Sequence, residues 1–218
     1  MMNRLFNFDK KNKKAKFLIG TDEAGRGPLA GPVVAAAVCF PVITNEIIKK
    51  LELINDSKQL SEKQREYLFD LIKDNSVYSI TPISVEEIER ENILRCSLKA
   101  MKISCENVIK TTGNDAEVFV DGNRKIPQFL YPQKTIIKGD GKSASVAAAS
   151  ILAKVYRDSL MKEYASVYPE YDFVNNKGYG TQKHIDAILK YGVTPLHRKS
   201  FLKKIFEREN EKQLTLNL

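Results

Sequence analysis

The sequence is poor in cysteine and histidine, and it contains no apolar run near the ~20 residues needed to cross a bilayer. Its cysteines, Cys39, Cys96 and Cys105, are odd in number and far apart, which excludes a disulfide framework and the paired spacing of a zinc site. We expect them to be reduced core residues. The first residues, from Met1 to Phe6, lack the apolar stretch of a signal peptide. These absences predict a soluble protein of the cytoplasm.

Acidic residues are outnumbered, because 35 Lys and Arg stand against 27 Asp and Glu and give a formal net charge of +8. A basic balance suggests a polyanionic partner such as nucleic acid, although a lysine-rich proteome would give the same bias. Much of the excess lies near the two ends of the chain, as candidate phosphate contacts or, equally, as a solvated surface. These basic residues are Lys10, Lys11, Lys13, Lys14, Lys16, Lys183, Lys190, Arg198, Lys199, Lys203 and Lys204.

The chain of 218 residues is long enough for one sizeable core. Short apolar and alternating runs predict strands over residues 16–20, 33–40, 78–83, 117–121 and 135–140. Capping patterns and amphipathic spacing predict helices that begin near Ser61 and Ser84 and helices over 94–109, 143–164, 182–190 and 200–211. This order indicates an α/β domain with a mixed sheet, in which ligands usually lie beyond the carboxyl ends of the strands.

An unusual motif occupies residues 21–32, where two adjacent acids stand directly before a glycine-rich turn that carries one arginine. Side chains alternate across a strand, so Asp22 and Glu23 point to opposite faces unless the backbone bends after Asp22. Gly25 and Gly27 allow such a bend at little cost. The alternative is an exposed hairpin turn with two solvated acids.

Two later strands are also predicted to end in an acid, at Asp121 and Asp140, which would gather four carboxylates with Asp22 and Glu23 at one edge of the sheet. Their mutual repulsion would raise their pKa values strongly unless divalent cations neutralised them. Oxygen ligands with no histidine or cysteine nearby favour Mg²⁺ or Mn²⁺ over zinc. Paired ions of this kind, typically ~3.5–4 Å apart, suit phosphodiester cleavage, so the pattern predicts a nuclease.

Two further acids are interpreted as structural. Asp158 is separated from Asp140 by a mostly helical stretch, which at ~1.5 Å per residue places the two about 25 Å apart, too far to share a metal ion. We interpret Asp158, with Arg157, as a structural or surface element of that helix. Asp56, which stands near Lys58 in a loop, is interpreted as a turn cap.

A series of motifs in one order makes the chain similar to bacterial ribonuclease HII over residues 17–201. They are Asp22-Glu23-Ala24-Gly25-Arg26-Gly27, Asp56-Ser57-Lys58, Val120-Asp121-Gly122-Asn123, Lys138-Gly139-Asp140, the run from Ala147 to Asp158, Gly178-Tyr179-Gly180-Thr181 and His197-Arg198-Lys199-Ser200-Phe201. The resemblance implies a ribonuclease H-like fold with a helical C-terminal part, and a site in which four acids hold two divalent ions, Mg²⁺ or Mn²⁺. The matching acids, none of them substituted, are Asp22, Glu23, Asp121 and Asp140.

The resemblance also implies how substrate is recognised. In the family the glycine-arginine-glycine turn, here Gly25, Arg26 and Gly27, reads the 2′-hydroxyl that separates RNA from DNA. Tyr179 matches the tyrosine that packs against the sugar of the next nucleotide, accepts deoxyribose there and selects an RNA-to-DNA junction; the alternative is a core tyrosine. Further phosphate or strand contacts implied in the same way are Lys58, Asn123, His184, Arg198 and Ser200.

The implied reaction is hydrolysis of the phosphodiester 5′ of a ribonucleotide embedded in duplex DNA, or of the RNA strand of a hybrid. It leaves 3′-hydroxyl and 5′-phosphate ends and would serve ribonucleotide excision repair and RNA primer removal. Two rival functions explain less of the sequence. A junction resolvase of the same fold needs the acids but neither Arg26 between glycines nor Tyr179, and a non-catalytic hybrid-binding module would be harmed by four clustered acids.

We expect a monomer with four segments: a basic N-terminal extension (1–16), the catalytic domain (17–165), a helical C-terminal subdomain (166–212) and a tail (213–218). The tail resembles the short peptide by which bacterial replication and repair proteins dock on the sliding clamp, because a glutamine followed by alternating leucines at an extended end suits an apolar pocket. The alternative is a frayed helix end whose leucines pack on their own domain. The residues concerned are Gln213, Leu214, Leu216 and Leu218.

Overall fold

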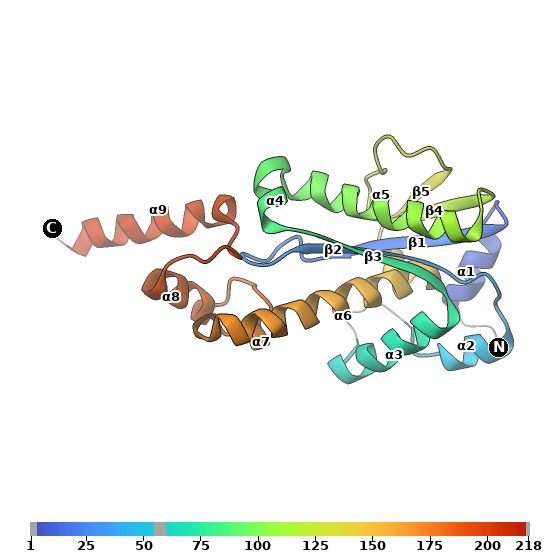
Figure 1. Ribbon diagram of the computed structural model, residues 1–218, viewed down its shortest axis with the longest axis horizontal. Helices are drawn as coiled ribbons and strands as arrows, with labels where there is room; N and C mark the ends of the chain where they lie inside the picture. Colours follow the sequence, from blue (N-terminus) through green and yellow to red (C-terminus); the bar gives the residue numbers. More distant parts are fainter. Residues whose placement is uncertain (1–3, 55–59, 217–218) are drawn as a thin grey trace.

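The computed structural model describes the backbone of residues 4–54 and 60–216, with side chains as far as residue 209. At its centre lies a mixed five-stranded sheet in the order β3-β2-β1-β4-β5 (Figure 1). The strands are β1 (Phe17–Ala24), β2 (Val33–Cys39), β3 (Val77–Ile83), β4 (Ala116–Asp121) and β5 (Gln133–Ile136). β2 runs antiparallel to both β1 and β3, whereas β4 is parallel to β1 and to β5. The parallel pairing brings the carboxyl ends of β1 and β4 to the same edge of the sheet.

Helices cover both faces of this sheet (Figure 1). α5 (Ile93–Thr112) packs on one face, while α6 (Ala144–Val167) and α3 (Glu62–Asn75) pack on the other. β2 is buried along its whole length and serves both cores, since its odd-numbered residues belong to the α5 side and its even-numbered residues to the α6 side. The predicted fold class, a mixed sheet flanked by helices, is confirmed.

Six further helices complete the part of the chain that the structure describes. They are α1 (Arg4–Asn12), α2 (Asn45–Lys50), α4 (Val85–Glu91), α7 (Phe173–Asn176), α8 (Gln182–Tyr191) and α9 (Lys199–Leu216), with single 3₁₀ turns at Gly139–Gly141 and Pro169–Tyr171. The capping predictions are confirmed: Ser61 and Gln64 form a reciprocal capping box at the start of α3, and the Ser84 hydroxyl accepts the amide hydrogen of Glu87 at the start of α4.

Two strand boundaries differ from the prediction. β1 extends four residues past Gly20 to Ala24, so Asp22 and Glu23 lie within a regular strand, and of the two possibilities the sequence left open the strand does not bend after Asp22. The strand continues because Asp22 pairs with Ala36 and Glu23 with Ala35 of the neighbouring β2. β5 ends at Ile136, and Asp140 follows it in the 3₁₀ turn rather than ending the strand.

The N-terminal extension is a helix that joins the core. Leu5 and Phe6 of α1 are 3% and 1% exposed, and the Phe6 ring lies 5.5 Å from that of Phe40. Asp9 of α1 accepts hydrogen bonds from the amide and hydroxyl of Ser145 in the first turn of α6. The basic residues of this segment therefore stand on a docked helix and the loop that follows it. The three cysteines are free and buried, as predicted.

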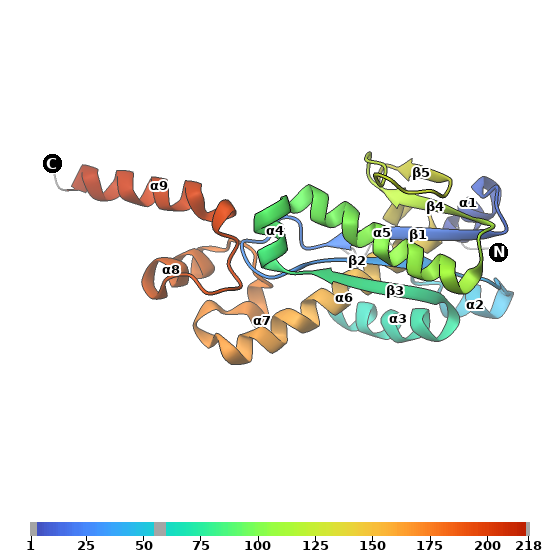
Figure 2. The ribbon, with the colours of Figure 1, turned by 45° about the horizontal axis from the view of Figure 1, so that its top comes forward.

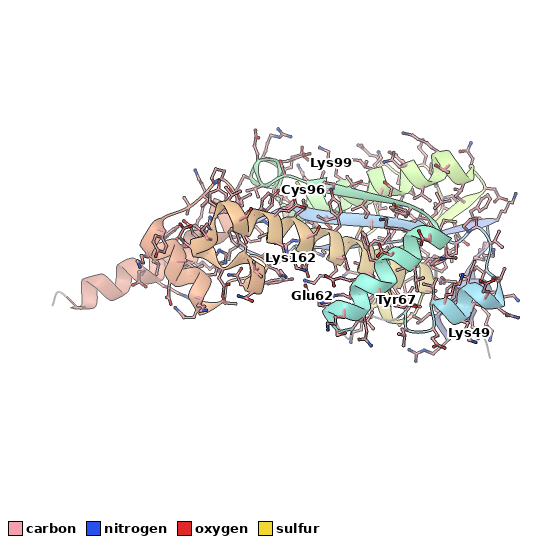
Figure 3. All side chains as sticks on the ribbon, turned by 60° about the horizontal axis from the view of Figure 1, so that its bottom comes forward. Lys49, Glu62, Tyr67, Cys96, Lys99 and Lys162 are labelled. Atoms are coloured by element: carbon pink, nitrogen blue, oxygen red, sulfur yellow. The ribbon has the colours of Figure 1, made fainter. Side chains whose placement is uncertain are left out.

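α3 and α6 are also linked at the surface (Figure 3). The ammonium group of Lys162 on α6 lies 2.9 Å from a carboxylate oxygen of Glu62 and 3.2 Å from one of Glu66, both on α3. All three side chains are about half exposed, so this network contributes only modestly to stability.

The C-terminal helix α9 projects from the body of the molecule, and the two ends of the chain lie at opposite ends of its long axis (Figures 1 and 2). Leu202 near its start is fully buried against α6 and α8, but the later turns extend outward. The backbone is helical through Leu216, so the prediction of an extended tail is wrong for Gln213, Leu214 and Leu216. Leu218 lies outside the described residues. Within the described part of the chain, no helix has the length and apolar character to cross a membrane.

Candidate active site

A cleft of about 660 Å³ opens at the end of β1. Its walls come from the end of the strand, the turn that follows it, one face of α6, the start of α5, the loop that carries Tyr179 and the start of α9. The lining residues are Asp22, Glu23, Ala24, Gly25, Arg26, Gly27, Ile93, Ser150, Lys154, Arg157, Tyr179 and Phe201. Segments far apart in the sequence thus bring Asp22, Glu23, the glycine-rich turn and Tyr179 to one place, whereas Asp121 and Asp140 are not among the residues that line the cleft.

The adjacent acids of β1 face opposite sides of the sheet. Asp22 is hydrogen-bonded to Ser150 of α6, whereas Glu23 is hydrogen-bonded to Ser97 of α5. The Glu23 amide also donates to Asp22 Oδ1 at 2.7 Å. Strand alternation therefore holds through both acids, which flank the end of the sheet from its two faces.

Asp121 and Asp140 are joined through the backbone between them. Asp121 is the last residue of β4, and its Oδ1 accepts the amide hydrogen of Gly139 at 2.7 Å. Asp140 follows in the 3₁₀ turn, is 6% exposed, and accepts the amide hydrogen of Gly141 at 3.0 Å. A side chain at Gly139 would reach within 3.2 Å of Asp121 Oδ1, so glycine there permits the close approach.

The surroundings of the two acids at the end of β1 disfavour their charged forms. Burial raises the pKa of Asp22 well above its usual value, and the neighbouring charges of Glu23 and Asp121 raise it further. Burial also raises the pKa of Glu23, although the guanidinium of Arg26, 3.3 Å away, opposes the shift. Burial and the nearby charge of Asp121 disfavour the ionised forms of Asp22 and Glu23, which creates a demand for positive charge at this edge of the sheet.

The donor set fits a hard divalent cation, because the acids offer carboxylate oxygens, and no histidine or cysteine stands among the described residues that line the cleft. As the side chains lie, however, no group of three or more acidic, histidine or cysteine residues within the described chain surrounds a single point. The reason is the same strand alternation that separates Asp22 from Glu23. The acids that would hold a metal ion are in place on the backbone, and their side chains would have to turn toward it.

The turn after the acids is shaped by glycine. Gly25 has φ +97°, and a side chain there would meet the guanidinium of Arg157 at 2.2 Å. Tyr179 lines the same cleft beside this turn, with its ring 3.7 Å from the position that a Cβ on Gly27 would take. Tyr179 is 45% exposed, so the alternative of a core tyrosine is excluded.

The family model for ribonuclease HII matches residues 19–206. The chain belongs to the ribonuclease HII family. It is 50% identical to the ribonuclease HII of Fusobacterium nucleatum over 97% of this chain and 96% of that one. Like its relatives, it is a ribonuclease H enzyme.

Solved structures agree with this ribonuclease HII fold. The crystal structure of ribonuclease H2 from Pyrococcus horikoshii OT3 matches with a TM-score of 0.67 and 27% identity, over 88% of this chain and 98% of that one. The structure of the PCNA:RNase HII complex from Archaeoglobus fulgidus matches with a TM-score of 0.66 and 25% identity, over 84% of this chain and 93% of that one.

Some contacts expected from the ribonuclease HII resemblance are placed differently by the structure. His184 and Arg198 are fully buried, so the prediction that they touch a phosphate directly is wrong for this conformation. Arg198 donates to the carbonyl oxygens of the 25–31 loop instead, and the Ser200 hydroxyl donates to Glu89 at 2.7 Å. Asn123 is exposed just after β4. Lys58, like Asp56, lies outside the described residues.

The sequence reasoning missed the α6 wall of this ribonuclease HII cleft. Ser150, Lys154 and Arg157 stand at helical spacing on one face of α6 and all line the cleft. Arg157 is 1% exposed and donates to the carbonyl oxygens of Ala30, Pro32 and Lys177, which confirms its structural role. The spacing of polar residues in an otherwise apolar, alanine-rich helix was the signal that could have revealed this face.

Proposed function

We propose that this protein hydrolyses the phosphodiester bond on the 5′ side of a ribonucleotide embedded in duplex DNA, and also the RNA strand of RNA/DNA hybrids, leaving 3′-hydroxyl and 5′-phosphate ends. The observation that carries the proposal is the meeting of the Asp22–Glu23 pair, the Gly25–Gly27 turn and Tyr179 in one cleft. This activity would serve ribonucleotide excision repair and RNA primer removal.

The residues divide the work. Asp22, Glu23, Asp121 and Asp140 would hold two divalent ions, Mg²⁺ or Mn²⁺. Bound ions of this kind lower the pKa of a water nucleophile and stabilise the negative charge that develops on the leaving oxygen. The demand for positive charge at these acids, seen in the raised pKa values of Asp22 and Glu23, supports this assignment.

The turn and Tyr179 would supply specificity. Two buried guanidinium groups, those of Arg157 and Arg198, bind the carbonyl oxygens of the 25–32 loop from inside the protein. The loop is thereby held in one shape next to the acids, where its backbone can approach the 2′-hydroxyl of a ribose. Tyr179 would pack against the sugar that follows; its exposed ring beside the turn in the same cleft supports this role.

The test is cleavage of a labelled DNA duplex that holds one ribonucleotide, with Mg²⁺, Mn²⁺ or EDTA, next to an all-DNA duplex and a long hybrid. We expect a metal-dependent nick immediately 5′ of the ribonucleotide and no cutting of the all-DNA control. Cutting of the long hybrid alone would remove the role of Tyr179. No cutting with any metal would leave only a hybrid-binding module.

We also propose that the C-terminal tail contacts a sliding clamp. Support comes from the Archaeoglobus fulgidus ribonuclease HII, whose structure was determined with PCNA, and from the outward projection of α9 (Figure 1). Because the backbone is helical through Leu216, its last turn would have to unwind to enter a pocket as an extended peptide. Deletion of residues 213–218 should abolish binding to the clamp of the same organism without changing nuclease activity. Equal binding by both proteins, or none by either, would remove the proposal.

A further inference from the structure

The chain has two histidines, and the structure buries both side by side behind Tyr179. His184 of α8 is 0% exposed and His197 is 2% exposed, and their Nε2 atoms are 3.1 Å apart. The aromatic rings of Tyr171 and Phe173 enclose the pair, with ring centres 4.9 Å from His197 and 5.4 Å from His184 respectively. These rings keep water from the imidazoles, so the hydrogen bonds inside the enclosure must be satisfied by protein groups.

The partners fix the direction of every hydrogen bond. His184 Nδ1 lies 2.9 Å from the carbonyl oxygen of Tyr179, which can only accept, so this nitrogen carries a hydrogen. In a neutral ring the Nε2 atom of His184 is then an acceptor, and the Nε2 atom of His197 must donate to it. His197 Nδ1 is left as an acceptor. The amide of Thr194 donates to it at 2.9 Å, and the Thr194 hydroxyl, which can donate as well, also lies 2.9 Å away.

The result is a one-way chain from Thr194 through His197 and His184 to the backbone of Tyr179. An additional proton fits this chain poorly, because it would set two donors against each other at His184 Nε2, or would face the Thr194 amide at His197 Nδ1 with only the Thr194 hydroxyl left to accept it. The burial of both rings, which lowers the pKa of His184 and brings that of His197 to about 4, agrees with two neutral imidazoles.

The segment from Thr194 to Arg198 also binds the loop that carries the glycine-rich turn. The Arg198 amide donates to Leu29 at 2.8 Å, and the Gly31 amide donates to Leu196 at 2.8 Å. The Arg198 guanidinium reaches the carbonyl oxygens of Gly25 and Gly31. Two consecutive residues therefore connect to both recognition elements: Arg198 to the glycine-rich turn, and His197, through His184, to Tyr179.

We propose that the His184–His197 pair is a positioning relay that sets Tyr179 at a defined distance from the Gly25–Gly27 turn, and so determines how well the enzyme selects an RNA-to-DNA junction. The inference rests on the proposed role of Tyr179 in the function given above. Neither histidine touches substrate. Their contribution is to orient the backbone of Tyr179, whose amide is fixed separately by the carbonyl of Asn176 at 2.9 Å.

Two variants of His197 test whether its hydrogen bond to His184 matters, or only the volume that its ring fills. Gln in place of His197 offers an amide N–H near the position of Nε2 and can still donate to His184, whereas Asn is too short to reach it. In His197→Asn we expect the ratio of kcat/KM for a single-ribonucleotide duplex over that for a long hybrid to fall about tenfold or more, since small misplacements of a positioning group have effects of this size. In His197→Gln we expect the ratio to stay within about threefold of wild type, below the tenfold that corresponds to 1.4 kcal/mol.

The relay would be overturned if His197→Asn kept its preference for the single-ribonucleotide duplex over the long hybrid, or if both variants lost that preference equally. Nitrogen-15 NMR of the two imidazoles in the wild-type protein tests it without any variant: we expect His184 protonated at Nδ1 and His197 at Nε2, and the opposite tautomers or a charged ring would overturn it. If the wild-type enzyme shows no preference for the junction, the proposed role of Tyr179 fails, and the NMR result still decides whether the hydrogen-bond chain exists.

Discussion

Asp121 shows at the scale of one residue why the acids of this site are where they are. It ends β4, the strand parallel to β1, so its carboxylate is delivered to the edge that Asp22 and Glu23 occupy. Its charge contributes to the raised pKa values of both. Repulsion between the charges makes such neighbours unfavourable for an acid with a purely structural role. The position of Asp121 therefore indicates a role in catalysis.

Asp121→Asn should reduce cleavage of the single-ribonucleotide duplex by about 100-fold or more, because several kcal/mol of transition-state stabilisation depend on the charge of a metal ligand. Binding of the duplex, measured by fluorescence anisotropy without added metal, should be preserved or strengthened. Asp70→Asn on the exposed face of α3 is the matched control for the loss of one charge. Normal Mg²⁺-dependent turnover in Asp121→Asn would exclude Asp121 from the site.

His197 should make stability depend on pH. Its pKa is about 4 in the folded protein against an ordinary value of 6.5, so only the unfolded chain takes up a proton between these values. The stability that neutral His197 contributes is fully present above pH 6.5. It is lost as the pH falls toward 4, and the loss amounts to roughly 3 kcal/mol at most. The Tm of the wild-type protein, measured by thermal unfolding from pH 7.5 to 4.5, should therefore approach the Tm of His197→Gln as the pH falls. A constant difference in Tm would contradict a neutral, buried His197.

At the scale of elements, the contact of β1 with the first turn of α6 sets the depth of the cleft. A Cβ on Gly20 would lie 2.1 Å from the carbonyl carbon of Ser145 and 2.2 Å from the amide nitrogen of Val146. Both atoms belong to a helix backbone and cannot move alone. Helix and strand are this close because glycine stands on the strand and small residues form the facing side of the helix, which brings Ser150 within reach of Asp22.

Gly20→Ala should lower the free energy of unfolding by about 3 kcal/mol or more, since the new methyl group must push the helix away. For a chain of this length that corresponds to a Tm lower by roughly 6–12 °C. Gly141→Ala is the control, because nothing lies within 4 Å of the added atom there. Calorimetry that finds the two variants equally stable would show that the β1–α6 contact is looser than described.

At the scale of the whole molecule, much of the excess positive charge lies near the two ends of the chain, while the carboxylates of Asp22, Glu23 and Asp121 meet at one edge of the sheet. The formal net charge is +8, and the later basic residues Lys203 and Lys204 are exposed on the projecting α9. A positively charged surface attracts a polyanion. The acidic edge of the sheet is instead suited to metal ions.

Binding of the single-ribonucleotide duplex to Asp121→Asn should weaken steeply with salt. Two phosphate contacts alone would reduce the affinity about tenfold between 50 and 200 mM salt. If α9 takes part, replacing Lys203 and Lys204 with Gln should reduce the slope of log Kd against log salt by about 2, whereas Lys49→Gln and Lys63→Gln, on α2 and α3, should leave it unchanged. An unchanged slope in the first pair would remove α9 from the interface.

The sequence by itself determined the strands and helices that build the mixed sheet, the capped starts of α3 and α4 and the places of the acids at or near strand ends, because each of these depends on residues close together in the chain. It could not place His184 and Arg198, whose ring and guanidinium look like substrate contacts until tertiary packing buries them. Their roles depend on carbonyl oxygens of Tyr179, Gly25 and Gly31, partners that only folding brings near. Local pattern determines which groups a segment carries, while tertiary structure decides whether each group faces solvent or another part of the protein.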